Sequence, residues 1–216
     1  MNTAKNLAVL DAAQIRVLGA LMEKSKTTPD YYPMTLNGLA AACNQKTSRK
    51  PVVQYDDSTI TTALNSLKIA GLISTATGGS IRNIKYKHNF AIVFPVLPSE
   101  VAVMCLLFLR GPQTPGEINT NSGRLYEFET LEEVNQTLEK LTSEGYLKQL
   151  PKRPGQKEQR YMHLFAGDME TFEEEYIAAE ENPKINTELE ERLTKVEEEL
   201  AELKTNLAKL MTELGV

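Results

Sequence analysis

The sequence predicts a mainly α-helical protein with small β-hairpin wings, built from two tandem winged helix-turn-helix domains and a C-terminal coiled-coil helix. Three observations support this prediction. One pattern of apolar and aromatic residues with a glycine occurs twice along the chain. Each occurrence lies where helical periodicity gives way to short alternating segments, which is typical of helices followed by a hairpin. The last 30 residues follow a leucine repeat with steps of four and three, which is typical of a coiled coil.

The internal repeat sets the expected domain organisation. Five positions recur with an offset of 74 residues: Ile60, Leu64, Leu67, Gly71 and Ile73 return as Val134, Leu138, Leu141, Gly145 and Leu147. Three more recur with an offset of 75: Tyr86, His88 and Phe90 return as Tyr161, His163 and Phe165. Two copies of one domain are the simplest explanation. The expected organisation is a first winged-helix domain over residues 1–92, a second over 93–167, an acidic helical linker over 168–186 and a coiled-coil tail over 187–216.

In the first copy we expect three helices and a hairpin. Asp11 caps the first helix, and Gln14, three residues later, completes a capping box. The third helix carries its apolar side chains on one face and stops at Gly71. The expected elements are helices that start at Asp11, near Thr35 and near Asp57, and strands over 72–75 and 81–90 with a turn at 78–79.

In the second copy the same order is expected. An apolar helix starts at Ser99 and ends at Gly111. Two further helices should begin at capping boxes, Thr114 with Glu117 and Thr130 with Glu133. The expected strands cover 146–150 and 159–165, and residues 91–98 join the two copies.

The tail predicts self-association. Its seam consists of Leu189, Leu193, Val196, Leu200, Leu203, Leu207, Leu210 and Leu214. Such a seam needs a second apolar surface, and we favour a second copy of the chain, which would form a dimer. The alternative is a surface of the chain's own domains. Because leucine dominates both seam positions, the sequence specifies neither the oligomer number nor the helix orientation.

Composition and charge exclude several classes of protein. The chain has 216 residues, and no apolar run approaches the roughly 20 residues that span a membrane. We expect a cytoplasmic protein without a signal peptide, with Cys43 and Cys105 as reduced thiols in the core. The charges divide unevenly, with 11 basic and 5 acidic residues in 1–90, 8 and 9 in 91–166, and 5 and 15 in 167–216. This asymmetry favours different partners for different segments.

No catalytic constellation is recognisable, so we expect a binding protein and not an enzyme. His88 and His163 have no metal-type spacing to another histidine or cysteine, and we interpret them as strand-face histidines packed against aromatic rings. A ligand-binding or pH-sensing role is the alternative. The turns at 78–79 and 153–156 lack the strand-to-helix context of a nucleotide motif. Neither a cofactor nor a metal is therefore expected.

The prediction of double-stranded DNA as a partner rests on the first copy. In a winged helix the third helix enters the major groove and the wing contacts the backbone. Beyond Asp57 the outward face of this helix has small polar side chains and no acidic residue, and asparagine can read adenine. Neighbouring cations can neutralise phosphates. The predicted DNA contacts of the first copy are Lys46, Arg49, Lys50, Ser58, Thr61, Thr62, Asn65, Lys68, Arg82, Lys85 and Lys87. The alternative is a basic surface that only keeps the protein in solution.

The second copy differs on the corresponding helix. Its outward face carries three carboxylates against one amine, Glu132, Glu133, Glu139 and Lys140. Because carboxylates repel phosphate, we expect that this helix does not enter DNA. Its wing is nonetheless basic, with Lys148, Lys152, Arg153, Lys157 and Arg160. Of these, Lys152, Arg153 and Lys157 are predicted to touch the DNA backbone, and a protein partner at this domain is the alternative.

Several stretches between residues 10 and 166 carry a family resemblance. They are 10–11, 18–19, 23–24, 42–46, 49–52, 109–117, 150–158 and 160–161. These stretches resemble the bacterial YceH-like proteins, a family of uncharacterised tandem winged-helix proteins. The chain departs from the family pattern at Gln14, where the resemblance implies glutamate, and at Lys50, where it implies an acid. The resemblance implies the fold, and it implies no activity and no site residues.

Together these observations predict a DNA-binding protein of the transcriptional-regulator type, which uses the basic first winged helix. The alternative is a protein–protein adaptor built from tandem winged helices without DNA binding. The acidic third helix of the second copy favours this alternative for that domain. A further argument is an analogy of fold alone, because tandem winged helices serve as adaptors in some other proteins.

Overall fold

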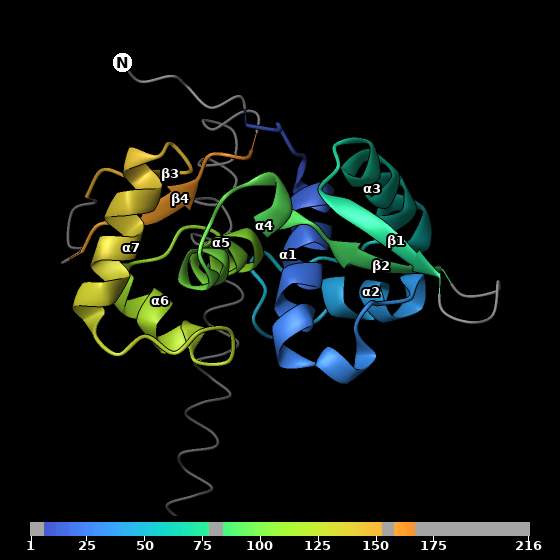
Figure 1. Cartoon of the computed structure of the whole chain (residues 1–216), viewed down its shortest axis with the longest axis horizontal. Helices are drawn as coiled ribbons and strands as arrows, with labels where there is room; N and C mark the ends of the chain where they lie inside the picture. The colour runs from blue at the N-terminus through green and yellow to red at the C-terminus, as the bar shows by residue number, and fades with distance from the viewer. Residues whose placement is uncertain (1–6, 78–83, 153–157, 167–216) are drawn as a thin grey trace, which may run out of the picture. The chain divides into compact units, whose positions relative to one another are not determined.

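The computed structural model describes residues 7–77, 84–152 and 158–166 (Figure 1). The chain divides into two compact units, Met1–Phe172 and Glu173–Val216. The predicted acidic linker and leucine seam lie outside the described residues, so they stay predictions. The described part is mainly helical with two small antiparallel hairpins, which confirms the expected fold class at this level. Within it, no helix is long and apolar enough to cross a membrane.

The first copy of the repeat contains three α-helices, a short 3-10 helix and a hairpin. Its elements are α1 (Ala12–Thr27), η1 (Pro29–Tyr31), α2 (Leu36–Cys43), α3 (Asp57–Ile69), β1 (Ile73–Thr77) and β2 (Ile84–His88). The predicted capping box is present, because the Asp11 carboxylate accepts a hydrogen bond from the Gln14 backbone N–H at 2.8 Å and the Gln14 side chain returns to the Asp11 N–H. Gly71 follows α3 with φ 72°, a left-handed conformation that glycine adopts at little cost.

The second copy repeats this order. Its elements are α5 (Pro98–Arg110), α6 (Pro115–Ser122), α7 (Leu131–Ser143), β3 (Leu147–Gln149) and β4 (Tyr161–His163). The capping box of Thr114 and Glu117 is present. The box predicted for Thr130 and Glu133 is wrong in one half. Thr130 Oγ1 accepts from the Glu133 N–H, but the Glu133 carboxylate accepts from the Tyr126 hydroxyl and the Glu129 N–H instead.

A short helix that the sequence did not predict joins the two copies. The chain leaves β2 at His88 and forms α4 (Phe90–Val93), so Phe90 is not a strand residue as predicted. The physical reason is burial: the Phe90 ring lies 5.0 Å from that of Phe94 and 5.7 Å from those of Phe108 and Phe165. Figure 1 shows α4 between the two copies.

The two copies share one hydrophobic core within the first unit. Helices α1 and α5 lie against each other at Gly19, where a Cβ atom would come within 3.0 Å of Phe108 Cβ. The Cys105 thiol donates to the Gly19 carbonyl at 3.5 Å across this contact. At the other end, the Leu10 N–H donates to the Phe165 carbonyl. The first and second copies are therefore held together both by side-chain packing and by backbone hydrogen bonds.

Candidate nucleic-acid interface

Helix α3 separates an apolar face from a polar one. Ile60, Ala63, Leu64 and Leu67 are buried against the core. The opposite face is exposed over the predicted DNA contacts Ser58, Thr61, Thr62, Asn65 and Lys68. These positions follow helical spacing, so one side of the helix presents them together. The structure thus brings five of the predicted contacts onto one surface.

The hydroxyl groups of this face are already engaged in local hydrogen bonds. Thr61 Oγ1 donates to the Asp57 carbonyl at 2.7 Å, and Thr62 Oγ1 donates to the Ser58 carbonyl at 3.0 Å. Ser58 Oγ donates to the Asp56 carboxylate. Asn65 and Lys68 differ, because neither side chain makes a hydrogen bond or ion pair with the described residues. The capacity to bind a partner is therefore concentrated at these two residues.

The N-terminal end of α3 is acidic. Asp56 caps the helix by accepting from the Thr59 N–H at 2.8 Å. Hydrogen bonds from Thr59, and then from Ser58, hold the pKa of the Asp56 carboxyl below its ordinary value. Asp57 adds a second carboxylate in the first turn. Because both would repel phosphate, a DNA backbone would be accommodated toward the Lys68 end of the helix.

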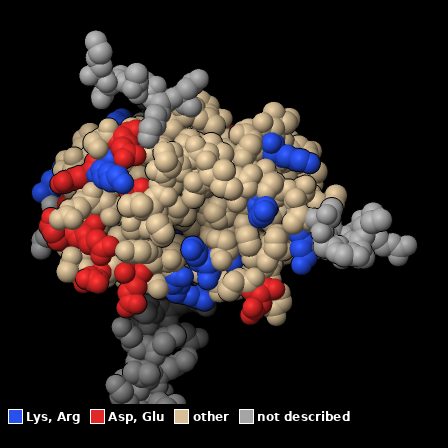
Figure 2. Space-filling view, viewed as in Figure 1, with Lys and Arg blue, Asp and Glu red and all other residues tan. Residues whose placement is uncertain are grey.

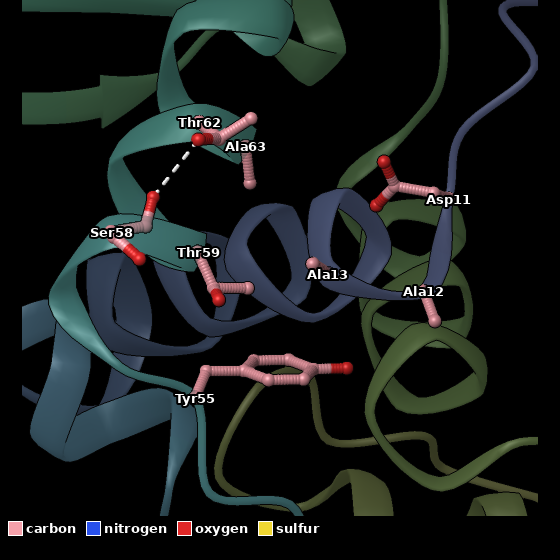
Figure 3. Close-up of a pocket in the computed structure, with 8 residues that line it drawn as sticks. All are labelled: Asp11, Ala12, Ala13, Tyr55, Ser58, Thr59, Thr62 and Ala63. Atoms are coloured by element: carbon pink, nitrogen blue, oxygen red, sulfur yellow. Dashed lines mark hydrogen bonds between the residues drawn. The ribbon is translucent and has the colours of Figure 1, made fainter.

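A hollow of about 480 Å³ lies between this end of α3 and the start of α1 (Figure 3). The Tyr55 ring crosses its floor with its hydroxyl toward the start of α1, and Asp11 lies at the far side. Burial raises the pKa of the Tyr55 hydroxyl, so the phenol is neutral. The Asn44 side chain fixes this segment by bonding the Tyr55 N–H and carbonyl, both at 2.8 Å. The acidic rim does not favour an anionic ligand here.

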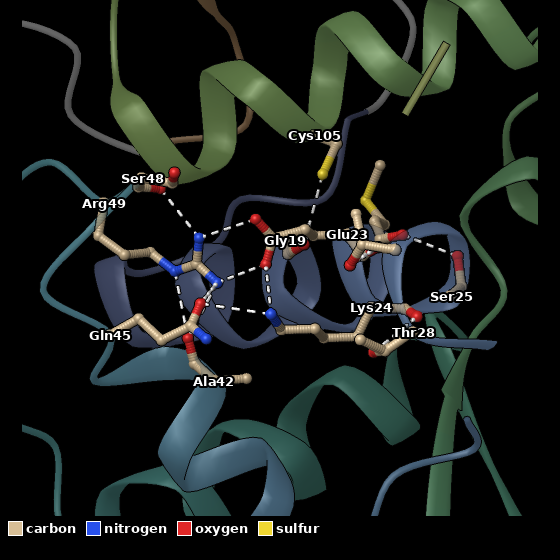
Figure 4. Close-up of polar contacts among 12 residues, drawn as sticks. Gly19, Glu23, Lys24, Ser25, Thr28, Ala42, Gln45, Ser48, Arg49 and Cys105 are labelled. Atoms are coloured by element: carbon tan, nitrogen blue, oxygen red, sulfur yellow. Dashed lines mark hydrogen bonds and ion pairs between the residues drawn. The ribbon is translucent and has the colours of Figure 1, made fainter. Parts of the chain in front are cut away.

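Arg49, one of the predicted phosphate contacts, is buried (Figure 4). Its guanidinium pairs with the Glu23 carboxylate through two bonds of 2.6 and 3.1 Å and also donates to the Ala42 carbonyl. Its side chain has 0% exposure. The prediction that Arg49 reaches DNA is therefore wrong for this structure, because the guanidinium is buried and bonded to Glu23 and Ala42 inside the first copy.

The remaining cations of the first copy fall into two groups. Lys46 is exposed and Lys50 is partly buried on the connection from α2 to α3, where the Lys50 N–H donates to the Leu109 carbonyl of α5. Lys85 and Lys87 lie on β2, the first partly buried and the second exposed. In Figure 1 the α2–α3 connection swings toward α5, whereas β2 lies on the other side of α1. Arg82 lies outside the described residues.

Helix α7 of the second copy presents a mostly acidic face. Glu132 and Glu139 are exposed on α7, while Glu133 is partly buried and bonded to Tyr126. The Lys140 ammonium lies 2.5 Å from the carboxylate of Glu100, which is itself buried. The single amine of this face is therefore paired. Figure 2 shows acidic side chains gathered over this copy, on the left of the view.

The predicted basic wing of the second copy is only partly described. Lys148 and Lys152 are exposed, and Arg153 and Lys157 lie outside the described residues. Arg160 is partly buried and binds the Glu117 carboxylate at 2.8 and 3.0 Å. It also donates to the Pro112 carbonyl. Arg160 therefore fixes the start of α6 and has few donors left for a phosphate.

The two histidines occupy equivalent places in the repeat. The His88 Nδ1 atom lies 3.4 Å from the Phe90 N–H, and the His163 Nδ1 atom lies 3.3 Å from the Phe165 N–H. Each ring packs against an aromatic ring, with centroid distances of 6.2 Å to Tyr32 and 4.9 Å to Phe108. Burial lowers the pKa of His88 to about 4 and that of His163 to about 3. Both are therefore neutral at pH 7.

The chain is similar in sequence to a family of bacterial proteins. Residues 10–156 match the family described as "Protein of unknown function, DUF480". A UPF0502 protein of Solibacter usitatus is 52% identical over 165 residues, which cover 76% of this chain and 80% of the relative. A UPF0502 protein of Geobacter metallireducens is 43% identical over 84% of each chain. A UPF0502 protein of Pectobacterium carotovorum is 41% identical over 85% of this chain and 90% of the relative.

Proposed function

Because the chain belongs to the DUF480 family of bacterial UPF0502 proteins, which is described without an activity, we propose a function from the surfaces of the chain itself. We propose that the protein is a DNA-binding protein of the regulator type. In this proposal the first copy is a winged helix, and α3 enters the major groove while the β1–β2 hairpin contacts the backbone. The second copy is also a winged helix, but its acidic α7 stays outside the groove.

One observation carries the proposal. Asn65 and Lys68 lie on the exposed face of α3 without partners among the described residues, on a stretch with no carboxylate after Asp57. An asparagine amide can bond the adenine edge through two hydrogen bonds, and a lysine can neutralise a phosphate. The order of three helices followed by a hairpin supports the same reading of the fold.

The test is fluorescence anisotropy with duplex DNA from a pool of genomic fragments, measured at two salt concentrations. Asn65→Ala should lose about 1–3 kcal/mol on the preferred sequence and little on other sequences. Lys68→Gln should weaken binding to all sequences and reduce the salt dependence by about one phosphate contact. Arg124→Gln serves as the matched control, because Arg124 is also an exposed cation but lies in the second copy.

Three results would contradict the proposal. The first is the absence of binding at low salt, where phosphate contacts are strongest. The second is equal weakening by Lys68→Gln and Arg124→Gln, since that would indicate diffuse attraction by any cation. The third is binding that Asn65→Ala leaves unchanged on every sequence.

A protein–protein adaptor is the second candidate, and the acidic α7 favours it. Glu132 and Glu139 are exposed there, while the neighbouring Lys140 is paired with Glu100. Such a surface suits a basic protein partner. Glu132→Gln with Glu139→Gln should abolish retention of a stoichiometric partner in a pull-down and leave DNA binding unchanged. Retention of DNA with no protein would contradict it.

We also propose that the tail dimerises the protein through its leucine seam. Leu200 and Leu203 occupy neighbouring seam positions of the heptad pattern. Replacing both with alanine should halve the mass found by light scattering at micromolar concentration. An unchanged mass would contradict dimerisation through the tail, and a monomeric parent protein would do so as well.

A further inference from the structure

A small polar cavity lies where the two copies meet. Its volume is about 170 Å³, smaller than the roughly 300–1,000 Å³ of pockets that enclose drug-sized molecules. The first copy lines it with the end of α1 and the connection that follows α2, and the second copy with the ends of α5 and α6. A ligand here would touch both copies at once.

Cations outnumber carboxylates around this cavity. Lys24, Arg110 and Arg124 line it, and Glu23 is its one carboxylate among the described residues. That carboxylate is already neutralised, because Arg49 binds it at 2.6 Å and Lys24 approaches it at 3.4 Å (Figure 4). Three lining cations therefore face one carboxylate that Arg49 already neutralises. Figure 2 shows basic side chains gathered on the lower edge of the molecule, between the loop that follows α6 and the end of α1.

Two arginines of the second copy line the cavity, Arg110 and Arg124, and neither has a carboxylate partner among the described residues. Arg110 instead donates to the Ser48 hydroxyl at 2.9 Å. Burial, and the neighbouring Arg49, lower the pKa of Arg110, against an opposing effect of Glu23. Ser48 holds a left-handed φ of 60°, which is uncommon for a residue with a side chain. The local structure thus gathers positive charge that Glu23 compensates only in part.

We infer that this cavity is a binding site for a small multivalent oxyanion, of the kind presented by inorganic phosphate or by the phosphoryl group of a metabolite. Guanidinium groups bind phosphate oxygens through paired hydrogen bonds, and lysine adds a point charge. Arg110 and Arg124 would supply the paired donors, and Lys24 would supply the point charge. Threonine, serine and glutamine side chains around the cavity offer further polar contacts.

The site is distinct from the surface proposed for DNA. Its cations come from the ends of α1 and α5 and from the loop that follows α6, whereas the DNA surface is the exposed face of α3. A cavity of this size admits a single anionic group but not a duplex backbone lying along it. A contact to DNA phosphate is therefore the competing explanation, and the variants below separate the two.

The experiment titrates the full chain with inorganic phosphate, pyrophosphate and a nucleoside triphosphate by calorimetry, at constant ionic strength kept with chloride. We expect saturable binding of one anion per chain and a rise in Tm with ligand concentration. Arg124→Gln should weaken binding at least about tenfold, which corresponds to about 1.4 kcal/mol. Arg110→Gln should do the same. Lys68→Gln is the matched control and should change the affinity less than about twofold.

The anions also distinguish the source of the ligand. Tighter binding of phosphate or pyrophosphate than of the triphosphate would support a free inorganic anion, and the reverse would support a phosphorylated metabolite. Because Arg124 is exposed and bonds no described residue, Arg124→Gln should fold normally, which circular dichroism and the ligand-free Tm would verify.

Several outcomes would overturn the inference. One is the absence of saturable binding up to about 10 mM of each anion, which would mean an affinity too weak for a built site. Another is equal weakening by Lys68→Gln. A third is loss of DNA binding in Arg124→Gln with unchanged anion binding, since the cavity would then belong to the DNA surface. Failure of DNA binding alone would leave this site intact.

Discussion

At the scale of single residues, Gly19 controls how closely the two copies approach each other. A Cβ atom there would lie 3.0 Å from Phe108 Cβ and 3.0 Å from Leu109 Cδ2. Both neighbours are buried, so neither can move away easily. The close contact between α1 and α5 therefore favours a residue without a side chain.

Gly19→Ala should destabilise the protein by about 1–3 kcal/mol through overpacking, as measured by urea denaturation. Gly123→Ala is the matched control. Gly123 has φ −53°, and nothing lies within 4 Å of its added Cβ. It should be neutral or stabilising by up to about 1 kcal/mol. Similar losses in both variants would argue against a steric origin at Gly19.

Glu23 and Arg49 form a pair whose value depends on both members. Glu23→Gln leaves the buried guanidinium without its counter-charge, and we expect a loss of about 3 kcal/mol. Replacing the pair together, Glu23→Leu with Arg49→Met, should recover much of this loss. A double-mutant cycle by chemical denaturation measures the coupling. Additive losses would mean that the two side chains do not act as a pair.

The same pair predicts a pH dependence. Burial raises the pKa of Glu23, but the hydrogen bond and charge of Arg49 outweigh burial and hold it below its ordinary value. A carboxyl group whose pKa is lower in the folded than in the unfolded state stabilises the fold at pH values above the unfolded-state pKa. This stabilisation is lost as the pH falls through the folded-state pKa. The stability gap between the parent protein and Glu23→Gln should therefore be full at pH 7 and shrink below about pH 4. A gap that stays constant down to pH 3 would contradict this.

The residue scale is also where the sequence predicts least. The sequence predicts Arg49 as a DNA contact because Lys46 and Lys50 lie close to it in the chain. Its actual partner, Glu23, is 26 residues away in the sequence. Arg110 and Arg124 meet Lys24 only after both copies have folded and docked. No local pattern reports such partners, because tertiary packing alone brings them together.

At the scale of elements, the hairpins hold the two histidines in equivalent places, where His163 is buried and His88 is partly buried. The lowered pKa values, about 4 for His88 and about 3 for His163, come mainly from burial. Folding therefore favours the neutral rings. The unfolded chain binds protons near pH 6.5, so stability should fall as the pH drops below that value and should level off below the folded-state pKa values.

This effect gives a measurable slope. Between about pH 6 and pH 4, each histidine should cost about 1.4 kcal/mol of unfolding free energy per pH unit. His88→Gln and His163→Gln should each flatten the slope by about that amount, whatever they do to stability at pH 7. Unfolding free energies from urea titrations at four pH values would measure it. A slope unchanged in both variants would mean that the rings titrate normally in the folded protein.

Elements with strong local signals were predictable. The starts of α1 and α6 follow from their capping boxes, and Gly71 ends α3 as its position suggests. The prediction that Phe90 is a strand residue failed for a different reason. Its sequence is strand-like, but the chain forms α4 there because this buries the Phe90 ring between the copies. The Glu133 carboxylate likewise accepts a hydrogen bond from the Tyr126 hydroxyl instead of making its predicted capping contact. A tertiary contact overrode the local pattern at Phe90, whereas at Glu133 another local contact, seven residues away in sequence, replaced the predicted one.

At the scale of the whole molecule, the repeat predicted two similar modules but not their shared core. Five aromatic rings meet at the junction: Phe90 on α4, Phe94 directly after it, Phe108 on α5, and Tyr146 and Phe165 beside the second hairpin. The same pattern that repeats with an offset of 75 residues thus places Phe90 and Phe165 in one cluster, 5.7 Å apart. Residues that a repeat makes equivalent need not serve separate cores.

This shared core predicts that the two copies unfold together. Phe165 is fully buried, and its ring contacts those of Phe90, Phe94 and Phe108. Phe165→Ala should cost about 3–5 kcal/mol through the cavity that it leaves. Because the cluster joins both copies, hydrogen exchange should accelerate to a similar extent in α3 of the first copy and α7 of the second, as mass spectrometry of peptides would show.

Ile92→Ala is the control, since Ile92 is 83% exposed on α4 and its loss should cost less than about 0.5 kcal/mol. Faster exchange confined to α7 would mean that the copies are energetically independent, and the anion site at their junction would then lack a rigid frame.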